Sequence, residues 1–109
     1  MLYHAIIAIE RVPVKLLVIN NLSSGFGEGA VYDFARSFSR DGDEVCLRST
    51  DGATDVRDLL RDADAFDAVV ASGGDGTVAT VSYLLANTEV PVLPFPAGTA
   101  NLLALNLAS

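Results

Sequence analysis

The chain has 109 residues, half of them hydrophobic and 19% charged, a composition typical of one small packed domain and unlike that of a disordered segment. Its net charge is −7, and its seven Lys and Arg residues are scattered singly along the sequence, which argues against a basic patch for nucleic acid or anionic lipid. The single cysteine, Cys46, cannot form a disulfide within the chain and is expected in the core of a cytoplasmic protein.

The first 14 residues are predicted to form an N-terminal extension or an extra strand. The apolar run at residues 5–9 is too short to span a bilayer, and it ends at Glu10 and Arg11. His4 is the only histidine of the chain and has no cysteine motif near it. We therefore expect His4 to be solvated rather than to ligate a metal.

From Lys15 onward the sequence predicts strands and helices in alternation. Residues 16–19 form a continuous apolar run, typical of a strand that is buried on both faces of a parallel sheet. Polar residues 20–29 are predicted to form a long loop. The helix after it is expected to end near residues 41–42, before a second strand at residues 44–48. The apolar stripe of this helix has the spacing i, i+3, i+4, i+7 and consists of Val31, Phe34, Ala35 and Phe38.

The second half of the sequence repeats this pattern. Thr54 is suited to cap a helix, and the apolar stripe of that helix consists of Val56, Leu59, Leu60 and Ala63. A strand is predicted at residues 68–71, and the helix after it is marked by Val78, Val81 and Leu85. A fourth strand at residues 92–95 and a helix that begins at residues 102–107 complete the pattern.

Strands that alternate with helices predict an α/β fold: a parallel sheet in a Rossmann-like, three-layer domain with helices on both faces. The leucines of residues 102–107 point nearly all round their predicted helix. We expect either a second domain or neighbouring copies in a homo-oligomer to cover that helix.

Two glycine-rich turns follow predicted strands, Ser-Gly-Gly-Asp-Gly-Thr at residues 72–77 and Pro-Ala-Gly-Thr-Ala-Asn at residues 96–101. Glycine permits positive φ and lets a ligand approach the main chain, and helix N-termini favour anions. Because the carboxyl ends of parallel strands share one edge of the sheet, both turns are expected to line one crevice. Alternatively, the turns are structural only, with Asp75 as a helix cap.

Neither glycine turn contains a cation. If the crevice holds phosphates, it must do so mainly with backbone N–H groups, with a metal ion or with residues from elsewhere. Asp75 itself repels an anion unless a cation or a proton intervenes.

These two turns, together with Asn-Leu-Ser-Ser-Gly at residues 21–25, resemble the motifs of the N-terminal catalytic-region domain of diacylglycerol kinases. That family is grouped with sphingosine kinases and NAD kinases. The loop at residues 21–25 matches the family's Asn-Pro-x-Ser-Gly except that Leu22 replaces proline. The resemblance covers residues 15–109, and the three motifs stand in the family's order.

The resemblance implies transfer of the γ-phosphoryl group of ATP to the hydroxyl of a lipid such as diacylglycerol, with Mg²⁺ nearby. It also implies a cytoplasmic protein that attaches peripherally to the inner face of the membrane. Backbone amides and hydroxyls would position the phosphates, which is the main requirement of phosphoryl transfer. The residues implied to bind the nucleotide are Asn21, Ser24, Gly25, Thr50, Gly73, Gly74, Asp75, Gly76, Thr77, Gly98, Thr99 and Asn101.

Besides Leu22, the sequence departs from the family at three further points. Leu102 stands where the family usually has Asp, and Ala79 and Thr80 stand where it often has Asn-Glu. Diacylglycerol kinases also take their general base and much of their lipid site from a second, β-rich domain, which does not fit in 109 residues. The catalytic residue is therefore unassigned, and we do not expect the isolated chain to be a competent kinase.

Three alternatives remain. In an NAD kinase-like enzyme, Asp75 would contact the hydroxyl that is phosphorylated. A dinucleotide-binding domain would use the G-x-G-x-x-A pattern at residues 25–30 with Asp51 about twenty residues on, although residues 20–24 separate that pattern from its strand. A stand-alone nucleotide-binding module would keep the fold without the chemistry.

Overall fold

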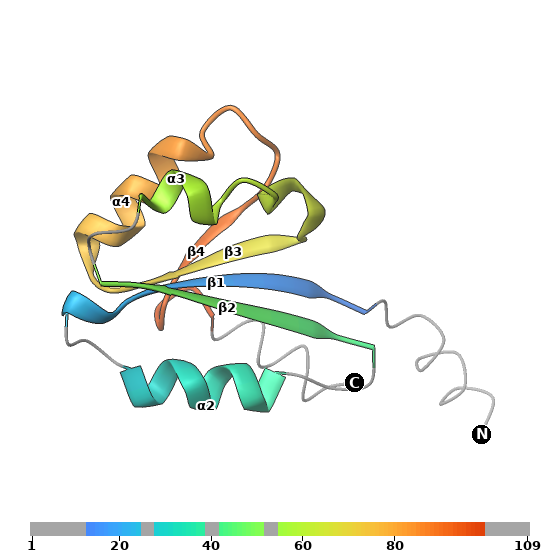
Figure 1. The fold of residues 1–109 in the computed structure, drawn as a ribbon. Coiled ribbons are helices and arrows are strands. Elements are labelled where there is room, and N and C mark those ends of the chain that lie inside the picture. Colours follow the sequence, from blue (N-terminus) through green and yellow to red (C-terminus); the bar gives the residue numbers. More distant parts are fainter. Residues whose placement is uncertain (1–12, 25–27, 39–41, 52–54, 100–109) are drawn as a thin grey trace, which may run out of the picture.

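A four-stranded, all-parallel sheet forms the centre of the molecule in the computed structural model, which describes residues 13–24, 28–38, 42–51 and 55–99 (Figure 1). The strands follow the order β2-β1-β3-β4. Their bounds are β1 (Lys15–Asn21), β2 (Glu44–Thr50), β3 (Ala68–Ser72) and β4 (Val92–Pro94). In register, Leu16 of β1 lies beside Val45 of β2 and Ala68 of β3.

The two middle strands are buried on both faces. Leu16, Leu17, Val18 and Ile19 have no exposed surface, and all five residues of β3 are buried. Because successive side chains of a strand point to opposite faces, these apolar runs supply two separate cores. The predicted α/β fold with a parallel sheet is thereby confirmed.

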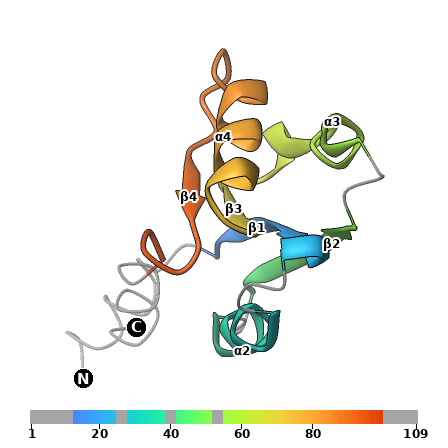
Figure 2. The ribbon, with the colours of Figure 1, turned by 90° about the vertical axis from the view of Figure 1, so that its left-hand side faces the viewer.

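Helix α2 (Glu28–Phe38) covers one face of the sheet. Figure 2 shows it on the side opposite to the other helices. The ring of Phe34 lies at the middle of this layer, with its centroid 5.9 Å from that of Phe38 and 5.6 Å from that of Phe95. The core on this face consists of Leu16, Val18, Val31, Phe34, Phe38, Ala68 and Val70.

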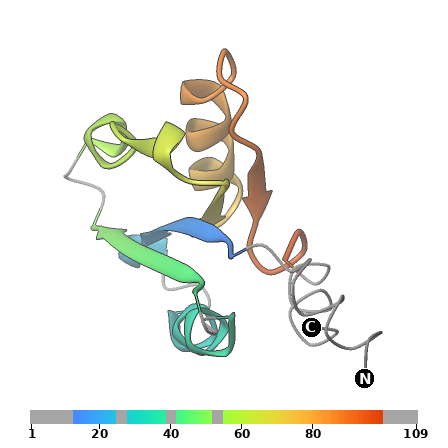
Figure 3. The same ribbon diagram turned by 90° about the vertical axis from the view of Figure 1, so that its right-hand side faces the viewer.

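The opposite face is covered by helix α3 (Val56–Leu59), the 3-10 turn η2 (Ala63–Ala65) and helix α4 (Asp75–Leu84), as Figure 3 shows. Their core consists of Leu17, Ile19, Leu60, Ala63, Val69, Ala71, Val81 and Leu85. Cys46 is half-buried and packs against this core, so it is less deeply buried than the sequence suggested. Helices on both faces, as predicted, give three layers.

The bounds predicted for the loop at residues 20–29 are wrong at both ends. β1 continues to Asn21, the 3-10 turn η1 (Leu22–Ser24) follows it, and α2 already begins at Glu28. Asn20 and Asn21 are polar, yet they stay in the strand because β2 pairs with β1 as far as Asn21 and β3 pairs with it as far as Asn20. The last predicted strand is one residue shorter than expected and ends at Pro94.

The helix predicted to carry residues 56–63 is also shorter than expected. α3 ends at Leu59, because the Arg48 guanidinium donates to the Leu59 carbonyl oxygen at 2.7 Å and to the Asp62 carboxylate at 2.6 and 2.9 Å. Leu60 and Ala63 still enter the core. The N-cap is Asp55, whose carboxylate accepts a hydrogen bond from the Arg57 amide at 2.9 Å.

Several predictions from the sequence fall outside the described residues. They concern residues 1–12 and the helix at residues 102–107. The predicted cap at Thr54 is wrong, because the N-cap of α3 is Asp55. Within the described part of the chain, no helix is long and apolar enough to cross a membrane.

The Arg48–Asp62 ion pair makes the stability of the fold depend on pH. The hydrogen bonds from Arg48 lower the pKa of the Asp62 carboxyl from 3.8 to about 2. A carboxyl whose pKa is lowered by folding stabilises the folded state above its unfolded pKa, and that contribution is lost as the pH falls through the folded pKa.

We therefore expect Asp62→Asn to lower the thermal midpoint at pH 7, with the difference from wild type shrinking between pH 3.8 and about 2. Thermal melts by circular dichroism across this range would measure it. Asp64→Asn is the matched control, since Asp64 is exposed on the neighbouring turn η2. A difference that is independent of pH would contradict the role of the ion pair.

Candidate functional site

A groove of about 370 Å³ opens at the carboxyl edge of the sheet, where β1, β2 and β3 end. Open α/β sheets bind ligands at this edge. The groove brings together loops that are far apart in the sequence. Its lining residues are Asn21, Thr50, Val56, Gly73, Gly76, Thr77 and Thr80.

Asn21 joins two of these loops. Its Nδ2 donates to Thr77 Oγ1 at 3.3 Å, and Thr77 Oγ1 donates to the Gly73 carbonyl oxygen at 3.2 Å. Its Oδ1 accepts hydrogen bonds from the amide and the hydroxyl of Ser23, at 3.0 and 2.7 Å. The same side chain therefore orders η1 and ties it to the turn between β3 and α4.

Gly73 is fixed by its surroundings. Its φ is 142°, and a Cβ on it would lie 2.6 Å from Asn21 Cβ and 2.8 Å from Thr77 Oγ1. Contacts this close do not occur between real side chains, so no other residue fits here without movement of β1 or α4. The first glycine of the turn thus allows the end of β1 to touch the start of α4.

Gly74 and Gly76 have a different environment. A Cβ on either would meet nothing within 4 Å, so the backbone of the turn is open on that side. Gly74 is the N-cap of the ten-residue helix α4 and offers no side-chain oxygen to the first amides. Uncapped amides and the positive end of the helix dipole make this surface suited to an anion.

Asp75 is exposed and is the first residue of α4. The alternative that Asp75 caps the helix is wrong, because the N-cap is Gly74. Its carboxylate is the only acidic side chain in the turn at residues 73–77, and it stands beside the groove instead of among the residues that line it.

The second glycine turn, which begins at Pro96, lies on the α2 side of the sheet and does not line the groove. Thr99 is 2% exposed, donates through Oγ1 to the Pro96 carbonyl oxygen at 2.8 Å, and lines a separate hollow of about 340 Å³ against α2. A Cβ on Gly98 would lie 2.7 Å from Pro94 Cδ, so this glycine is required by the turn itself. The structure does not bring these two residues into the groove.

Of the other predicted site residues, one lines the groove and the rest do not line it or lie outside the described residues. Thr50, which the family resemblance predicts to contact the nucleotide, is 3% exposed at the end of β2 and lines the groove. Ser24 ends η1, and Gly25 and Asn101 lie outside the described residues. Two lining residues, Val56 and Thr80, were missed. The spacing of Thr80 after Gly76 and Thr77, i+4 and i+3 on one helix, was the available signal.

Two buried polar side chains lie on the α2 face near the same edge. Asn20 is 1% exposed and Ser72 is fully buried, and the two residues are paired in register between β1 and β3. Within the described residues, neither side chain has a hydrogen-bond partner. Since unpartnered polar groups are costly to bury, they mark this end of the sheet as chemically different from its apolar middle.

A parallel three-layer domain with glycine-rich turns at the carboxyl edge defines a class of α/β proteins that bind ligands at that edge. Within this class, the chain belongs to the diacylglycerol kinase catalytic domain family, whose model matches residues 15–109. The recognition made from the motifs is confirmed.

Similar proteins include the diacylglycerol kinases of Mycobacterium tuberculosis strains CDC 1551 / Oshkosh and ATCC 25618 / H37Rv. Each is 39% identical over 92 residues, covering 80% of this chain and 29% of the relative. The chain therefore spans less than a third of the length of these relatives. No solved structure matches it.

The close fit at Gly73 yields a test of the site's architecture. Gly73→Ala is expected to destabilise the fold by about 2 kcal/mol or more, because a methyl group meets Asn21 and the backbone strain adds to the clash. Gly29→Ala is the matched control. Gly29 lies in α2 with nothing within 4 Å of its Cβ position, so the same change should stabilise by about 0.5–1 kcal/mol. Urea unfolding of both variants would measure the difference, and equal effects would contradict it.

Proposed function

We propose that this chain is the nucleotide-binding part of an ATP-dependent lipid kinase. The enzyme would transfer the γ-phosphoryl group of ATP to the hydroxyl of a lipid such as diacylglycerol. The main support is the groove that Asn21, Thr50 and the turn at residues 73–77 form together. Membership of the diacylglycerol kinase catalytic domain family supports the choice of substrates.

The phosphates would lie over the turn between β3 and α4. That surface is open above Gly74 and Gly76, and it ends in the uncapped first turn of α4. The hydroxyl of Thr77 is already engaged with Gly73 and Asn21, so it would hold the turn in shape while backbone amides contact the phosphates. Positioning of this kind is the main catalytic contribution of a protein to phosphoryl transfer.

Mg²⁺ would be held chiefly by the phosphates. Among the described residues, no three His, Cys, Asp or Glu side chains gather closely enough to hold a metal ion. Mg²⁺ commonly binds through one or two carboxylates, substrate phosphates and water. Asp75 is the acidic side chain placed for this task, beside the open backbone of the turn.

The acceptor side of the reaction is proposed to lie in a second, β-rich domain, which would supply the general base and most of the lipid site. Residues 15–109 would then be the nucleotide domain and residues 1–14 an extension. The isolated chain would bind ATP without transferring phosphate. We propose that the complete enzyme is cytoplasmic and attaches peripherally to the inner membrane face. Ser24, Gly25, Gly98, Thr99 and Asn101 remain predicted nucleotide contacts.

Blocking the open backbone tests the nucleotide site. Gly76→Val should weaken binding of both Mg²⁺–ATP and Mg²⁺–tripolyphosphate by about tenfold or more, because its side chain would occupy the space proposed for the phosphates. Isothermal titration calorimetry of the folded chain would measure both ligands. Ser82→Ala, an exposed position on the same helix that does not line the groove, should leave both unchanged.

Two outcomes of that titration, extended to NAD as a third ligand, would contradict the proposal. A folded wild-type chain that binds neither ligand would leave the groove without its proposed role. A chain that binds NAD but not ATP would favour the NAD kinase-like alternative.

Asp75 is tested by removing its charge alone. Asp75→Asn in the complete two-domain enzyme should lower turnover by at least about tenfold while the thermal midpoint stays close to wild type, since the side chain is exposed and caps nothing. Asp64→Asn, exposed on η2, is the control for the change in net charge. Unchanged turnover in Asp75→Asn would remove Asp75 from the reaction.

A further inference from the structure

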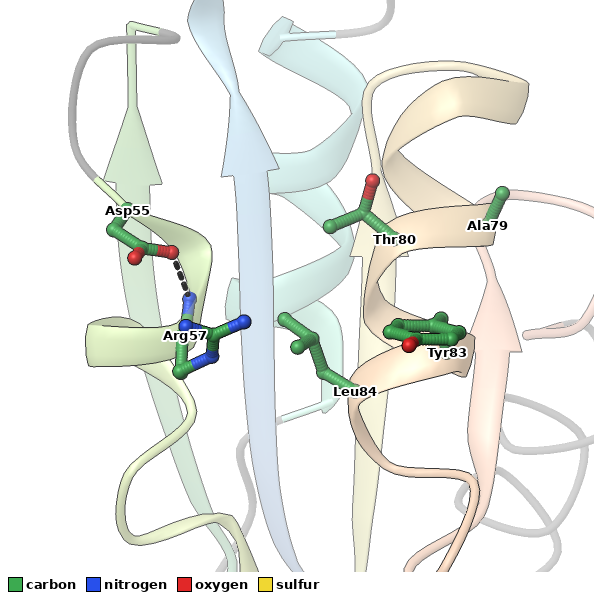
Figure 4. A pocket seen from close by; sticks show the side chains of 6 residues that line it. All are labelled: Asp55, Arg57, Ala79, Thr80, Tyr83 and Leu84. Atoms are coloured by element: carbon green, nitrogen blue, oxygen red, sulfur yellow. Dashed lines mark hydrogen bonds between the residues drawn. The ribbon is translucent and has the colours of Figure 1, made fainter.

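A second hollow continues from the groove along the outer side of the molecule, between α3 and α4. Its volume is about 360 Å³. Figure 4 shows Arg57 on the α3 side and Tyr83 on the α4 side, with the side chains of Thr80 and Leu84 between them. The residues that line it are Asp55, Arg57, Ala79, Thr80, Tyr83 and Leu84.

The two hollows adjoin each other. Thr80 lines both, and on the α3 side Val56 lines the groove while its two neighbours in sequence, Asp55 and Arg57, line the second hollow. Along α4, Gly76, Thr80 and Tyr83 follow one another at spacings of four and three residues, which places them in one stripe of the helix. At 1.5 Å per residue, this stripe runs about 10 Å from Gly76 to Tyr83.

Arg57 is distinctive among the cations of the described residues. Four of them form an ion pair with a carboxylate: Lys15, Arg36, Arg48 and Arg61. No such pair involves the Arg57 guanidinium within the described part of the chain. An unpaired guanidinium that lines a hollow is available to a ligand, and it is a planar group that stacks on aromatic rings.

Tyr83 is equally distinctive. It is 79% exposed, and of the large hydrophobic side chains that the structure describes, Leu22 is the other exposed one, at 39%. The Tyr83 side chain is thus outside the core and open to solvent. Ala79 is small and Leu84 is apolar, so the hollow beside the ring is suited to a flat, largely apolar group.

We infer that this hollow receives the base of the nucleotide, which stacks on the Tyr83 ring with the Arg57 guanidinium on the opposite wall. The inference rests on the proposed function, because the base is placed by phosphates held at residues 73–77. The stripe of α4 separates the two subsites by about 10 Å, the scale of a ribose with its base. Aromatic stacking on a base is tolerant of sequence and needs no hydrogen bond.

The test separates the base from the phosphates. Tyr83→Ala should weaken ATP binding by about tenfold, in line with the loss of one base–aromatic stack, and Tyr83→Phe should bind ATP as wild type does. Tripolyphosphate, which has no base, should bind wild type and Tyr83→Ala equally. Arg57→Ala should weaken ATP and spare tripolyphosphate. Ser82→Ala controls for a change on the adjacent helix face. Calorimetric titration would give all of these affinities.

Each outcome decides one point. If wild type binds ATP and Tyr83→Ala binds it as tightly, the base site is overturned while the proposed function stands. If Tyr83→Ala or Arg57→Ala weakens tripolyphosphate as much as ATP, that residue acts on the phosphates and its place in the base site is overturned. If wild type binds neither ATP nor tripolyphosphate, the proposed function is overturned, and the base site that rests on it is overturned as well. Equal thermal midpoints for Tyr83→Ala and wild type would confirm that the change acts on the ligand and not on the fold.

Discussion

The candidate site depends on one close approach, that of the Gly73 backbone to the end of β1. Asn21 and Thr77 are 56 positions apart in the sequence, yet their side chains meet over Gly73. This contact sets where α4 starts and, through Asn21 Oδ1, how η1 leaves the sheet. A side chain at Gly73 would force β1 and α4 apart, and the residues lining the groove would separate with them.

The charge of the molecule limits which interactions could bind an anion in this groove. The net charge is −7, and none of the residues that line the groove is charged. The attraction available from the helix dipole is modest, about 0.3–1 kcal/mol at an exposed site. A phosphate chain would therefore need its own divalent cation, and its affinity would depend on the concentration of that cation more than on salt bridges to the protein.

The sequence predicts the layers of this fold because buried parallel strands are continuous apolar runs, as residues 16–19 and 68–71 are. The glycine spacing likewise indicates where the groove opens. The end of α3 could not be predicted from its own sequence. It is set by a side chain from β2, because the Arg48 guanidinium donates a hydrogen bond to the Leu59 carbonyl oxygen. The lining role of Val56 depends on how α3 lies beside α4, which no local pattern encodes, whereas Thr80 could have been found from its spacing on one helix after Gly76 and Thr77. The second turn lies outside the groove because its strand is at the edge of the sheet, with Phe95 packed on Phe34 toward α2.

That edge strand also limits how the domain can associate with others. β4 has only three residues, with Pro91 directly before it and Pro94 at its end. Proline has no amide hydrogen to donate, and short strands offer few groups for pairing. A further strand added along β4 would find almost no hydrogen-bond ladder to extend. Among the described residues the sheet ends at β4, so a domain or copy that joins this side of the molecule would pack mainly against its side chains.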